Sequence, residues 1–104
     1  MIYICTLNGN AIITSDKGIA KVASENGIDV LEINEGFIKL RNLSYGFIGG
    51  ATGLVEENLL AVNGDIETHP DADRIKQFCK KHGTELYMLK SGILEDIGTI
   101  IVNL

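Results

Sequence analysis

The side chains that could do chemistry are densest between residues 65 and 73, where acidic residues and a histidine stand at alternate positions. The five residues of this cluster are Asp65, Glu67, His69, Asp71 and Asp73. Carboxylate and imidazole groups together can bind a divalent cation, and they can also contact a ligand or substrate. Acidic residues in such a run are equally suited to the start of a helix. The spacing of the cluster and the residues around it distinguish between a metal site, a ligand site and a helix start.

The spacing within the cluster argues against a metal site. Asp65, Glu67 and His69 alternate as at the start of a calcium-binding loop, but Pro70 stands where the turn glycine belongs. No glutamate follows at the twelfth position to bind the ion in bidentate fashion. We therefore expect neither a metal nor another cofactor.

Helix capping is the simpler interpretation of the end of the cluster. Asp71 and Asp73 fall in the first turn of a predicted helix, where negative charge is favourable. The basic residues of that helix are expected to form a solvated face: Arg74, Lys76, Lys80 and Lys81. A ligand- or substrate-binding role remains the alternative for Asp65, Glu67 and His69.

The chain has two cysteines, Cys5 and Cys79. A nucleophilic cysteine needs a lowered pKa or a neighbouring base. Cys79 falls on the apolar face of a predicted helix and Cys5 within a predicted strand, so we expect both to be small buried hydrophobes. Cys5 stays a weak candidate nucleophile. Two cysteines are too few for a disulfide framework and favour a reduced, cytoplasmic protein.

Length and charge limit the class of protein. The chain has 104 residues, a net charge of −5 and 45% hydrophobic residues, which predicts one globular domain over residues 1–104. The negative charge argues against a protein that coats nucleic acid or an anionic membrane. No apolar run approaches the roughly 18 residues that a membrane helix needs.

The first third of the chain predicts the order strand, strand, helix, strand. The expected elements are a strand over 2–7, a hairpin turn at Asn8-Gly9, a strand over 11–14, a helix that starts at Ser15 or Asp16 and ends at Asn26-Gly27, and a strand over 29–33. Asn-Gly favours a two-residue hairpin because both positions tolerate positive φ. The apolar stripe of the helix is Ile19, Ala20, Val22 and Ala23.

The same order recurs in the second part of the chain. Gly83 matches Gly27, and Ile75 matches Ile19 at the same offset. The expected second unit begins near 46–48 and has strands over 58–62 and 85–89, a helix over 71–82 and an insertion at 63–70; a trailing strand follows within 98–103. The sequence therefore predicts an α/β fold of two strand-strand-helix-strand units, at about 1–44 and 45–94, around one core.

The glycine-rich stretch at 49–53 allows two interpretations. Val55, Leu59 and Val62 lie at helix spacing, so Gly49 and Gly50 could form a loop that holds a phosphate before a helix. The repeat instead favours a strand through Gly49 and Gly50 with a turn at 56–58. Glycines in a strand allow another part of the chain to approach closely.

The segments at 10–21, 45–50, 63–71 and 96–101 resemble those of a bacterial family of uncharacterised proteins that is assigned to the pentein fold. Longer members of that family carry further units, so this chain looks like their C-terminal part. Enzymes of the pentein fold modify guanidino groups, and one translation factor with this fold is a non-catalytic ribosome-binding protein. The resemblance implies units that form an incomplete propeller here, because a complete pentein ring has five.

The resemblance also implies roles for the cluster. Pentein enzymes hold a guanidinium with carboxylates, use a histidine as general acid or base, and place a nucleophilic cysteine near the C-terminus. Asp65 and His69 could take the first two roles, but residues 96–104 contain no cysteine. We therefore expect a non-catalytic domain that binds a ligand or partner. The alternative is a guanidino or amidino hydrolase that uses His69 and Asp65 with a cysteine from another module or chain.

Two largely uncharged strands are expected at the ends of the chain, over 2–7 and 99–102. Unprotected edge strands tend to pair with another chain, and a two-fold partner is the commonest solution. We therefore expect a homodimer or higher homo-oligomer. A small ligand could bind at the junction of the units, near Gly49, Gly50 and Asp65.

Overall fold

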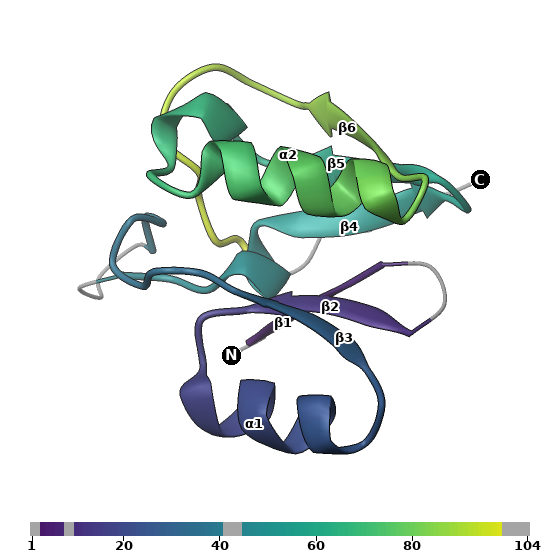
Figure 1. Ribbon diagram of the computed structural model, residues 1–104. Coiled ribbons are helices and arrows are strands. Elements are labelled where there is room, and N and C mark those ends of the chain that lie inside the picture. The colour runs from purple at the N-terminus through teal and green to yellow at the C-terminus, as the bar shows by residue number, and fades with distance from the viewer. Residues whose placement is uncertain (1–2, 8–9, 41–44, 99–104) are drawn as a thin grey trace.

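The computed structural model describes residues 3–7, 10–40 and 45–98. It contains two three-stranded sheets and two α-helices, which confirms the α/β class (Figure 1). The elements are β1 (Ile4–Thr6), β2 (Ala11–Thr14), α1 (Lys17–Glu25), β3 (Asp29–Glu32), the 3-10 helix η1 (Ile48–Gly50), β4 (Thr52–Glu56), β5 (Leu59–Val62), the 3-10 helix η2 (Ile66–Thr68), α2 (Ala72–Lys81) and β6 (Glu85–Met88). Neither α-helix in this part of the chain has the length and apolar character needed to span a bilayer.

The two sheets have the same internal pairing. In the order β1-β2-β3, the first pair is antiparallel and the second is parallel. In the order β4-β5-β6, the first pair is again antiparallel and the second parallel. In each sheet the parallel pair is connected through an α-helix, as a parallel connection requires.

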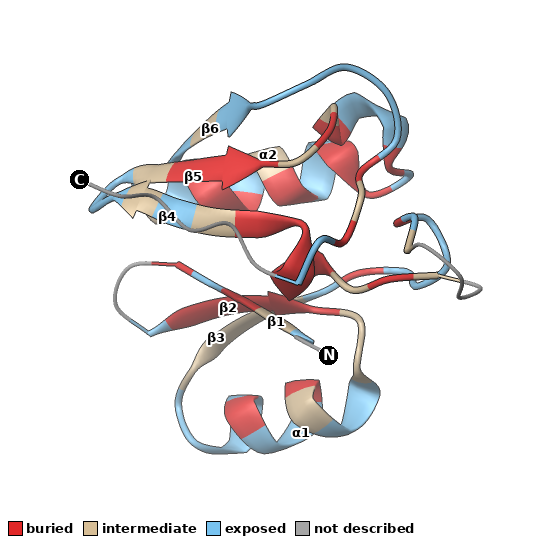
Figure 2. Ribbon diagram, turned by 180° about the vertical axis from the view of Figure 1, so that it is seen from behind, coloured by how far each residue is buried: buried red, intermediate tan, exposed pale blue. Residues whose placement is uncertain are grey.

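The β1-β2-β3 sheet is covered on both faces. Figure 1 shows α1 on one side of it and the second half of the molecule on the other. All four residues of β2 are buried, which follows because side chains alternate between two covered faces (Figure 2). The central apolar cluster joins both halves: Cys5, Leu7, Ala11, Ile13, Ile33, Ile38, Ile48, Ala51, Leu60, Val62, Ile66, Ile75, Phe78, Cys79 and Leu94.

Helix α1 begins and ends where the sequence predicts. The Asp16 carboxylate accepts a hydrogen bond from the Ile19 backbone N–H at 2.9 Å and caps the first turn. Asn26 is the C-cap, and Gly27 follows with φ +80°. Of the predicted apolar stripe, Ala20 and Ala23 are buried, but Val22 is exposed. The second half of the chain therefore does not cover the side of α1 that carries Val22.

The prediction of a strand through Gly49 and Gly50 is wrong. Residues Ile48–Gly50 form the 3-10 helix η1, and the strand begins only at Thr52. The Thr52 hydroxyl donates to the Ile48 carbonyl at 2.7 Å and closes this turn. A helix over 54–62 is also absent, because β4 and β5 form a hairpin there.

Gly50 lies against the buried carboxylate of Asp96. That carboxylate accepts hydrogen bonds from the backbone N–H groups of Phe47 at 3.0 Å and Gly98 at 2.9 Å. A Cβ atom on Gly50 would lie 1.7 Å from Asp96 Oδ1, so only glycine leaves room for the carboxylate. The close approach expected at this glycine is made by the side chain of Asp96. No local pattern in the sequence indicates that Asp96 lies there.

The remaining strand predictions differ little from the structure. The last strands of the two halves end at Glu32 and Met88, one residue earlier than expected. The Leu7 N–H donates to the Ala11 carbonyl at 3.0 Å, at the base of the first hairpin. The predicted turn at Asn8-Gly9 and the predicted trailing strand over 99–102 lie outside the described residues.

Gly50→Ala is expected to lower the free energy of unfolding by about 1–3 kcal/mol, because the new methyl group overlaps the Asp96 carboxylate. Urea unfolding at pH 7, followed by circular dichroism, measures this change. Gly18→Ala is the matched control, since an added Cβ there meets only Asp16 Oδ1 at 3.3 Å and alanine is the better helix former. A loss of similar size in both variants would contradict the role of Asp96.

Candidate functional site

The insertion at 63–70 carries three of the predicted site residues, and η2 sets their positions. Asp65 precedes η2, and its Oδ1 accepts a hydrogen bond from the Glu67 backbone N–H at 3.0 Å. Glu67 is exposed and forms an ion pair with Lys76 of α2. His69 follows η2 as its C-cap residue. Asp65 and Glu67 therefore have structural partners, while His69 turns into the protein.

His69 is buried, with 2% of its surface exposed. Its Nδ1 accepts a hydrogen bond from the Asp71 backbone N–H at 3.0 Å, so the neutral ring carries its proton on Nε2. Nε2 makes no hydrogen bond. Burial lowers the pKa of His69, although the Asp71 carboxylate and the Asn34 backbone oppose this shift. The ring is therefore neutral at physiological pH, with a buried donor left over.

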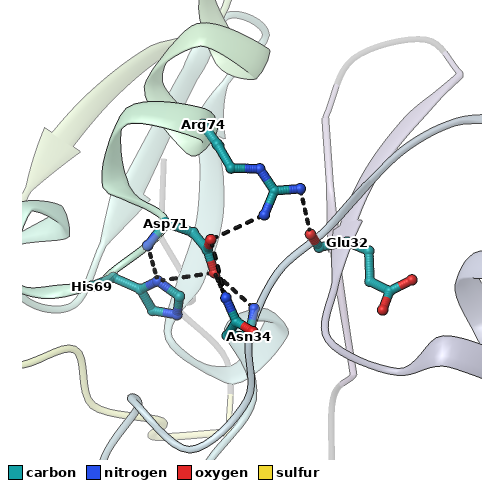
Figure 3. Close-up of polar contacts among 5 residues, drawn as sticks. All are labelled: Glu32, Asn34, His69, Asp71 and Arg74. Carbon is teal, nitrogen blue, oxygen red and sulfur yellow. Dashed lines mark hydrogen bonds and ion pairs between the residues drawn. The ribbon is translucent and has the colours of Figure 1, made fainter.

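Asp71 is the N-cap residue of α2, but the prediction that its side chain caps the helix is wrong. The carboxylate instead reaches the first half of the chain (Figure 3). Its Oδ2 accepts hydrogen bonds from the Asn34 backbone N–H at 2.7 Å and from Asn34 Nδ2 at 3.0 Å. Its Oδ1 accepts one from Arg74 at 3.0 Å. Burial alone would raise the pKa of Asp71, but these donors hold it below its usual range.

Arg74 extends the same network, although its side chain is 55% exposed, in keeping with the predicted solvated face. One end of its guanidinium binds Asp71, and the other donates to the Glu32 carbonyl at 2.9 Å. Arg74 therefore joins the start of α2 to the end of β3. In Figure 3 the Glu32 carboxylate points away from Arg74. The acidic group of Glu32 is thus not used by this network.

A hollow of about 410 Å³ opens beside this network, at the C-terminal ends of β2 and β3. Its walls are Ser15, Asp16, Lys17, Glu32, Ile33, Asn34, Glu35 and Phe37. Three carboxylates and one ammonium group give these walls a net negative charge. Two of the wall residues contact the buried network: Asn34 binds Asp71, and the Phe37 ring meets the His69 ring edge-on, with centroids 5.7 Å apart.

This hollow is not among the sites predicted from the sequence. The sequence does contain a pattern that indicates it, because the strands over 11–14 and 29–33 are predicted on either side of a helix. Such strands pair in parallel, and the residues that follow their C-terminal ends meet at one edge of the sheet. Ser15–Lys17 and Ile33–Glu35 are those residues.

The predicted ligand-binding glycines lie elsewhere. The space in front of Gly50 is occupied by the Asp96 carboxylate, and the Gly50 carbonyl accepts a hydrogen bond from Ile97 at 2.9 Å. Gly49 borders a different hollow, together with Cys5 and Thr52. Asp65, Glu67 and His69 do not line that hollow.

Both cysteines are buried. Cys5 contacts Thr52 and lies near Cys79, and burial raises its pKa to about 12. Burial also raises the pKa of Cys79 to about 11. The side-chain contacts of His69 are with Asp71, Asn34 and Phe37. Neither thiol is therefore placed to be activated by His69.

A cluster of three or more histidine, cysteine, aspartate or glutamate side chains that could hold a metal ion does not occur among residues 3–7, 10–40 and 45–98. Asp65 and Glu67 are bonded to other protein groups as described, and His69 Nδ1 accepts from the backbone.

Residues 3–101 match the model of a family described as a family of unknown function (DUF6873). This chain belongs to the DUF6873 family. No curated protein matches it. Among solved structures, C. jejuni agmatine deiminase is similar, with a TM-score of 0.49 and 16% sequence identity over 84% of this chain and 31% of that chain. This DUF6873 chain thus spans about a third of the length of the deiminase.

In this DUF6873 chain, Asp71→Asn is expected to lower the free energy of unfolding at pH 7 by about 1–3 kcal/mol, because an amide is a poorer acceptor for Arg74 and Asn34. The folded-state pKa of Asp71 lies below its unfolded value of about 3.9. Its contribution is therefore complete above that unfolded value and is lost as the pH falls through the folded-state pKa. The gap between wild type and variant should shrink in that range.

Urea unfolding at a series of pH values from neutral to acidic measures this gap. Asp73→Asn is the control, because that side chain is 88% exposed and its substitution should change the stability by less than about 0.5 kcal/mol. A gap that stays constant down to the lowest pH would contradict the assignment to the Asp71 carboxylate.

Proposed function

We propose that this chain is a non-catalytic, pentein-like domain that binds a small cationic ligand in the acidic hollow at the ends of β2 and β3. The ligand class is a guanidinium or an alkylammonium ion. Carboxylates in a partly enclosed hollow favour such a cation, and a guanidinium pairs with them through two parallel hydrogen bonds.

The burial of both thiols carries the non-catalytic part of the proposal. A thiolate is the attacking species in cysteine-dependent hydrolysis, and burial raises the pKa of Cys5 to about 12 and that of Cys79 to about 11. Because the whole sequence has no third cysteine, the chain cannot supply a reactive thiolate by itself. The hydrolase alternative therefore requires a cysteine from elsewhere.

The charge and the border of the hollow support the ligand. Asp16, Glu32 and Glu35 outnumber Lys17 in its walls. Phe37 adds an aromatic face that can contact a guanidinium.

We also infer that the two halves are copies of one pentein-like unit, which makes this chain a partial propeller. The shared strand pairing supports this inference. So do two pairs of glycines with positive φ at matching places: Gly27 at +80° and Gly83 at +66°, and Gly36 at +96° and Gly92 at +88°. Positions that favour glycine after the helix and after the last strand are thus shared by both halves.

Agmatine, which carries both a guanidinium and an ammonium group, is expected to bind in the hollow with weak, millimolar affinity. A 1H–15N NMR titration should shift the amide signals of residues 15–17 and 32–37. Glu32→Gln should weaken binding several-fold, because it removes one of the three wall carboxylates. Glu56→Gln, which removes an exposed charge at the end of β4, is the matched control and should leave binding unchanged.

Equal shifts with a dicarboxylate such as glutarate, or no shifts in the hollow with agmatine, would contradict the proposed ligand class. Urea separates the two features of the ligand, since it has the planar donors of a guanidinium without the charge. It should bind far more weakly than agmatine.

The chain is expected to release neither ammonia nor urea from agmatine or arginine. The two thiols should also resist alkylation by iodoacetamide until urea unfolds the chain, because both are buried. Mass spectrometry of the alkylated protein and a colorimetric ammonia assay measure the two outcomes. Turnover that disappears in His69→Ala would instead establish the hydrolase.

A further inference from the structure

His69 is a buried titratable group that the proposed ligand site does not use. Its side chain is fully buried, and Nδ1 accepts a hydrogen bond from the Asp71 backbone N–H at 3.0 Å. Nε2, which carries the proton, has no hydrogen-bond partner among the described residues. The surroundings of the ring therefore suit its neutral form, with Nδ1 as an acceptor.

Protonation of the ring reverses the role of Nδ1. Both nitrogens of an imidazolium are donors, so a proton that moves from solvent to Nδ1 meets the Asp71 N–H, which is also a donor. The hydrogen bond between them is lost. Because a buried donor without an acceptor is unfavourable, the charged ring requires a new partner.

The acceptor beside the ring is the Asp71 carboxylate, whose Oδ2 lies 3.8 Å from Nδ1 (Figure 3). This distance is too long for a hydrogen bond, so the carboxylate has to approach the ring. Oδ2 already accepts from the Asn34 backbone N–H at 2.7 Å and from Asn34 Nδ2 at 3.0 Å. A charged donor at His69 therefore competes with Asn34 for the same oxygen.

Two neighbours of this pair border the acidic hollow. Asn34 and Phe37 are wall residues, and the Phe37 ring meets the His69 ring edge-on, with centroids 5.7 Å apart. Asn34 lies two residues beyond the end of β3, so its bonds to Asp71 fix the chain where it leaves the sheet and enters the wall. A change at the ring thus reaches the wall through two contacts.

The charged groups on the elements around the ring come from η2, the start of α2 and the end of β3: Asp65, Glu67, Asp71, Arg74, Glu32 and Glu35. Glu67 is paired with Lys76, and Arg74 with Asp71. Among the described residues, Asp71 is the charged group that acts on the pKa of His69, and it favours the protonated ring. Asp71 is therefore the expected partner of the imidazolium.

Burial sets the pH range of this change. It lowers the pKa of His69 below its ordinary value of about 6.5, against the opposing effects of the Asp71 carboxylate and the Asn34 backbone. The ring is therefore neutral at pH 7 and gains its proton only in acidic solution.

We propose that His69 makes the acidic hollow sensitive to pH. Protonation of its ring draws the Asp71 carboxylate away from Asn34, loosens the wall of the hollow and so weakens the binding of a cation. The added positive charge, in contact with Phe37, acts in the same direction. His69 is a positioning residue in this proposal, since it acts through Asp71 and the wall. The effect on the ligand rests on the proposed function, whereas the effect on Asn34 does not.

The binding of the proton and the binding of the cation are coupled, so each must affect the other to the same extent. If the cation binds only the form with a neutral ring, its Kd rises by up to about tenfold for each pH unit below the midpoint of His69. Saturating agmatine in turn moves this midpoint to lower pH. A hollow that does not depend on His69 shows neither effect.

NMR spectroscopy of the ligand-free protein at a series of pH values from neutral to acidic is the first test. The ring 15N signals of His69 should show the proton on Nε2 at neutral pH and on both nitrogens below the midpoint. The backbone and side-chain amide signals of Asn34 should shift with the same midpoint. Asn34 signals that do not follow the ring would overturn the proposal.

His69→Asn is the test variant, because its side-chain oxygen can accept from the Asp71 N–H in place of Nδ1 but does not titrate. The Asn34 shift at the wild-type midpoint should disappear, and agmatine affinity should fall less steeply with pH than in the wild type. His82→Gln is the matched control. It removes the other histidine, which contacts Asp29 and does not line the hollow, and it should behave like the wild type.

Circular dichroism at each pH establishes that the chain remains folded. This control is needed because the unfolded chain gains the His69 proton at a higher pH than the folded chain. The folded state therefore loses stability as the pH falls from about 6.5 toward the folded-state pKa of His69.

Two further outcomes separate the parts of the proposal. Agmatine affinity that falls equally with pH in the wild type and in His69→Asn would overturn the control of the hollow by His69. Failure of agmatine to bind at any pH would refute the proposed function and the effect on the ligand together. The Asn34 titration of the wild type still decides, without a ligand or a variant, whether the protonated ring draws Asp71 away from Asn34.

Discussion

The buried carboxylate of Asp71 is the interaction on which the site and the joining of the two halves depend. It accepts hydrogen bonds from the backbone N–H and the side-chain amide of Asn34 and from Arg74, and Arg74 in turn binds the end of β3. Removing a carboxylate from water is unfavourable unless charged and neutral donors replace the water, as they do here. Because Asn34 follows β3 and Asp71 begins α2, this satisfied carboxylate holds the second helix against the first sheet. The same backbone turn directs the Asp71 N–H to His69 Nδ1 and so determines which ring nitrogen carries the proton.

Local features of the fold were predictable from the sequence, whereas interactions across the chain were not. The Asp16 cap and the Asn26-Gly27 end of α1 depend on a few neighbouring residues, and both were predicted correctly. The Asp71 side chain follows the same local rule in sequence, yet it bonds to Asn34 instead of capping α2. A capping residue and a bridging residue have the same local signature, and only the position of a distant strand distinguishes them. For the same reason, the need for Gly50 became visible only with Asp96 beside it.

The candidate site shows the same limit. The sequence placed chemistry in a run of alternating acidic residues, but η2 separates these side chains into a cap at Asp65, an ion pair at Glu67 and a buried ring at His69. Alternation in sequence brings side chains to one face only in an extended strand, and residues 66–68 are not extended. The hollow instead gathers residues from the ends of two parallel strands that are separated by a helix. The hollow is negatively charged because carboxylates that follow both strands meet there.

The difference between the two helices follows from what covers each of them. Helix α2 packs on its own sheet and also contacts β3 of the first sheet, and Phe78 and Cys79 on its buried face belong to the central cluster. Helix α1 has the sheet on one side only, and at the place of Phe78 it has the smaller Val22. The last residues of the two helices also differ in charge. Helix α2 ends in Lys81, which pairs with Asp29, whereas α1 ends in Glu25. The first sheet and the ion pair at its edge thus account for the burial of α2, whereas the side of α1 that carries Val22 stays exposed.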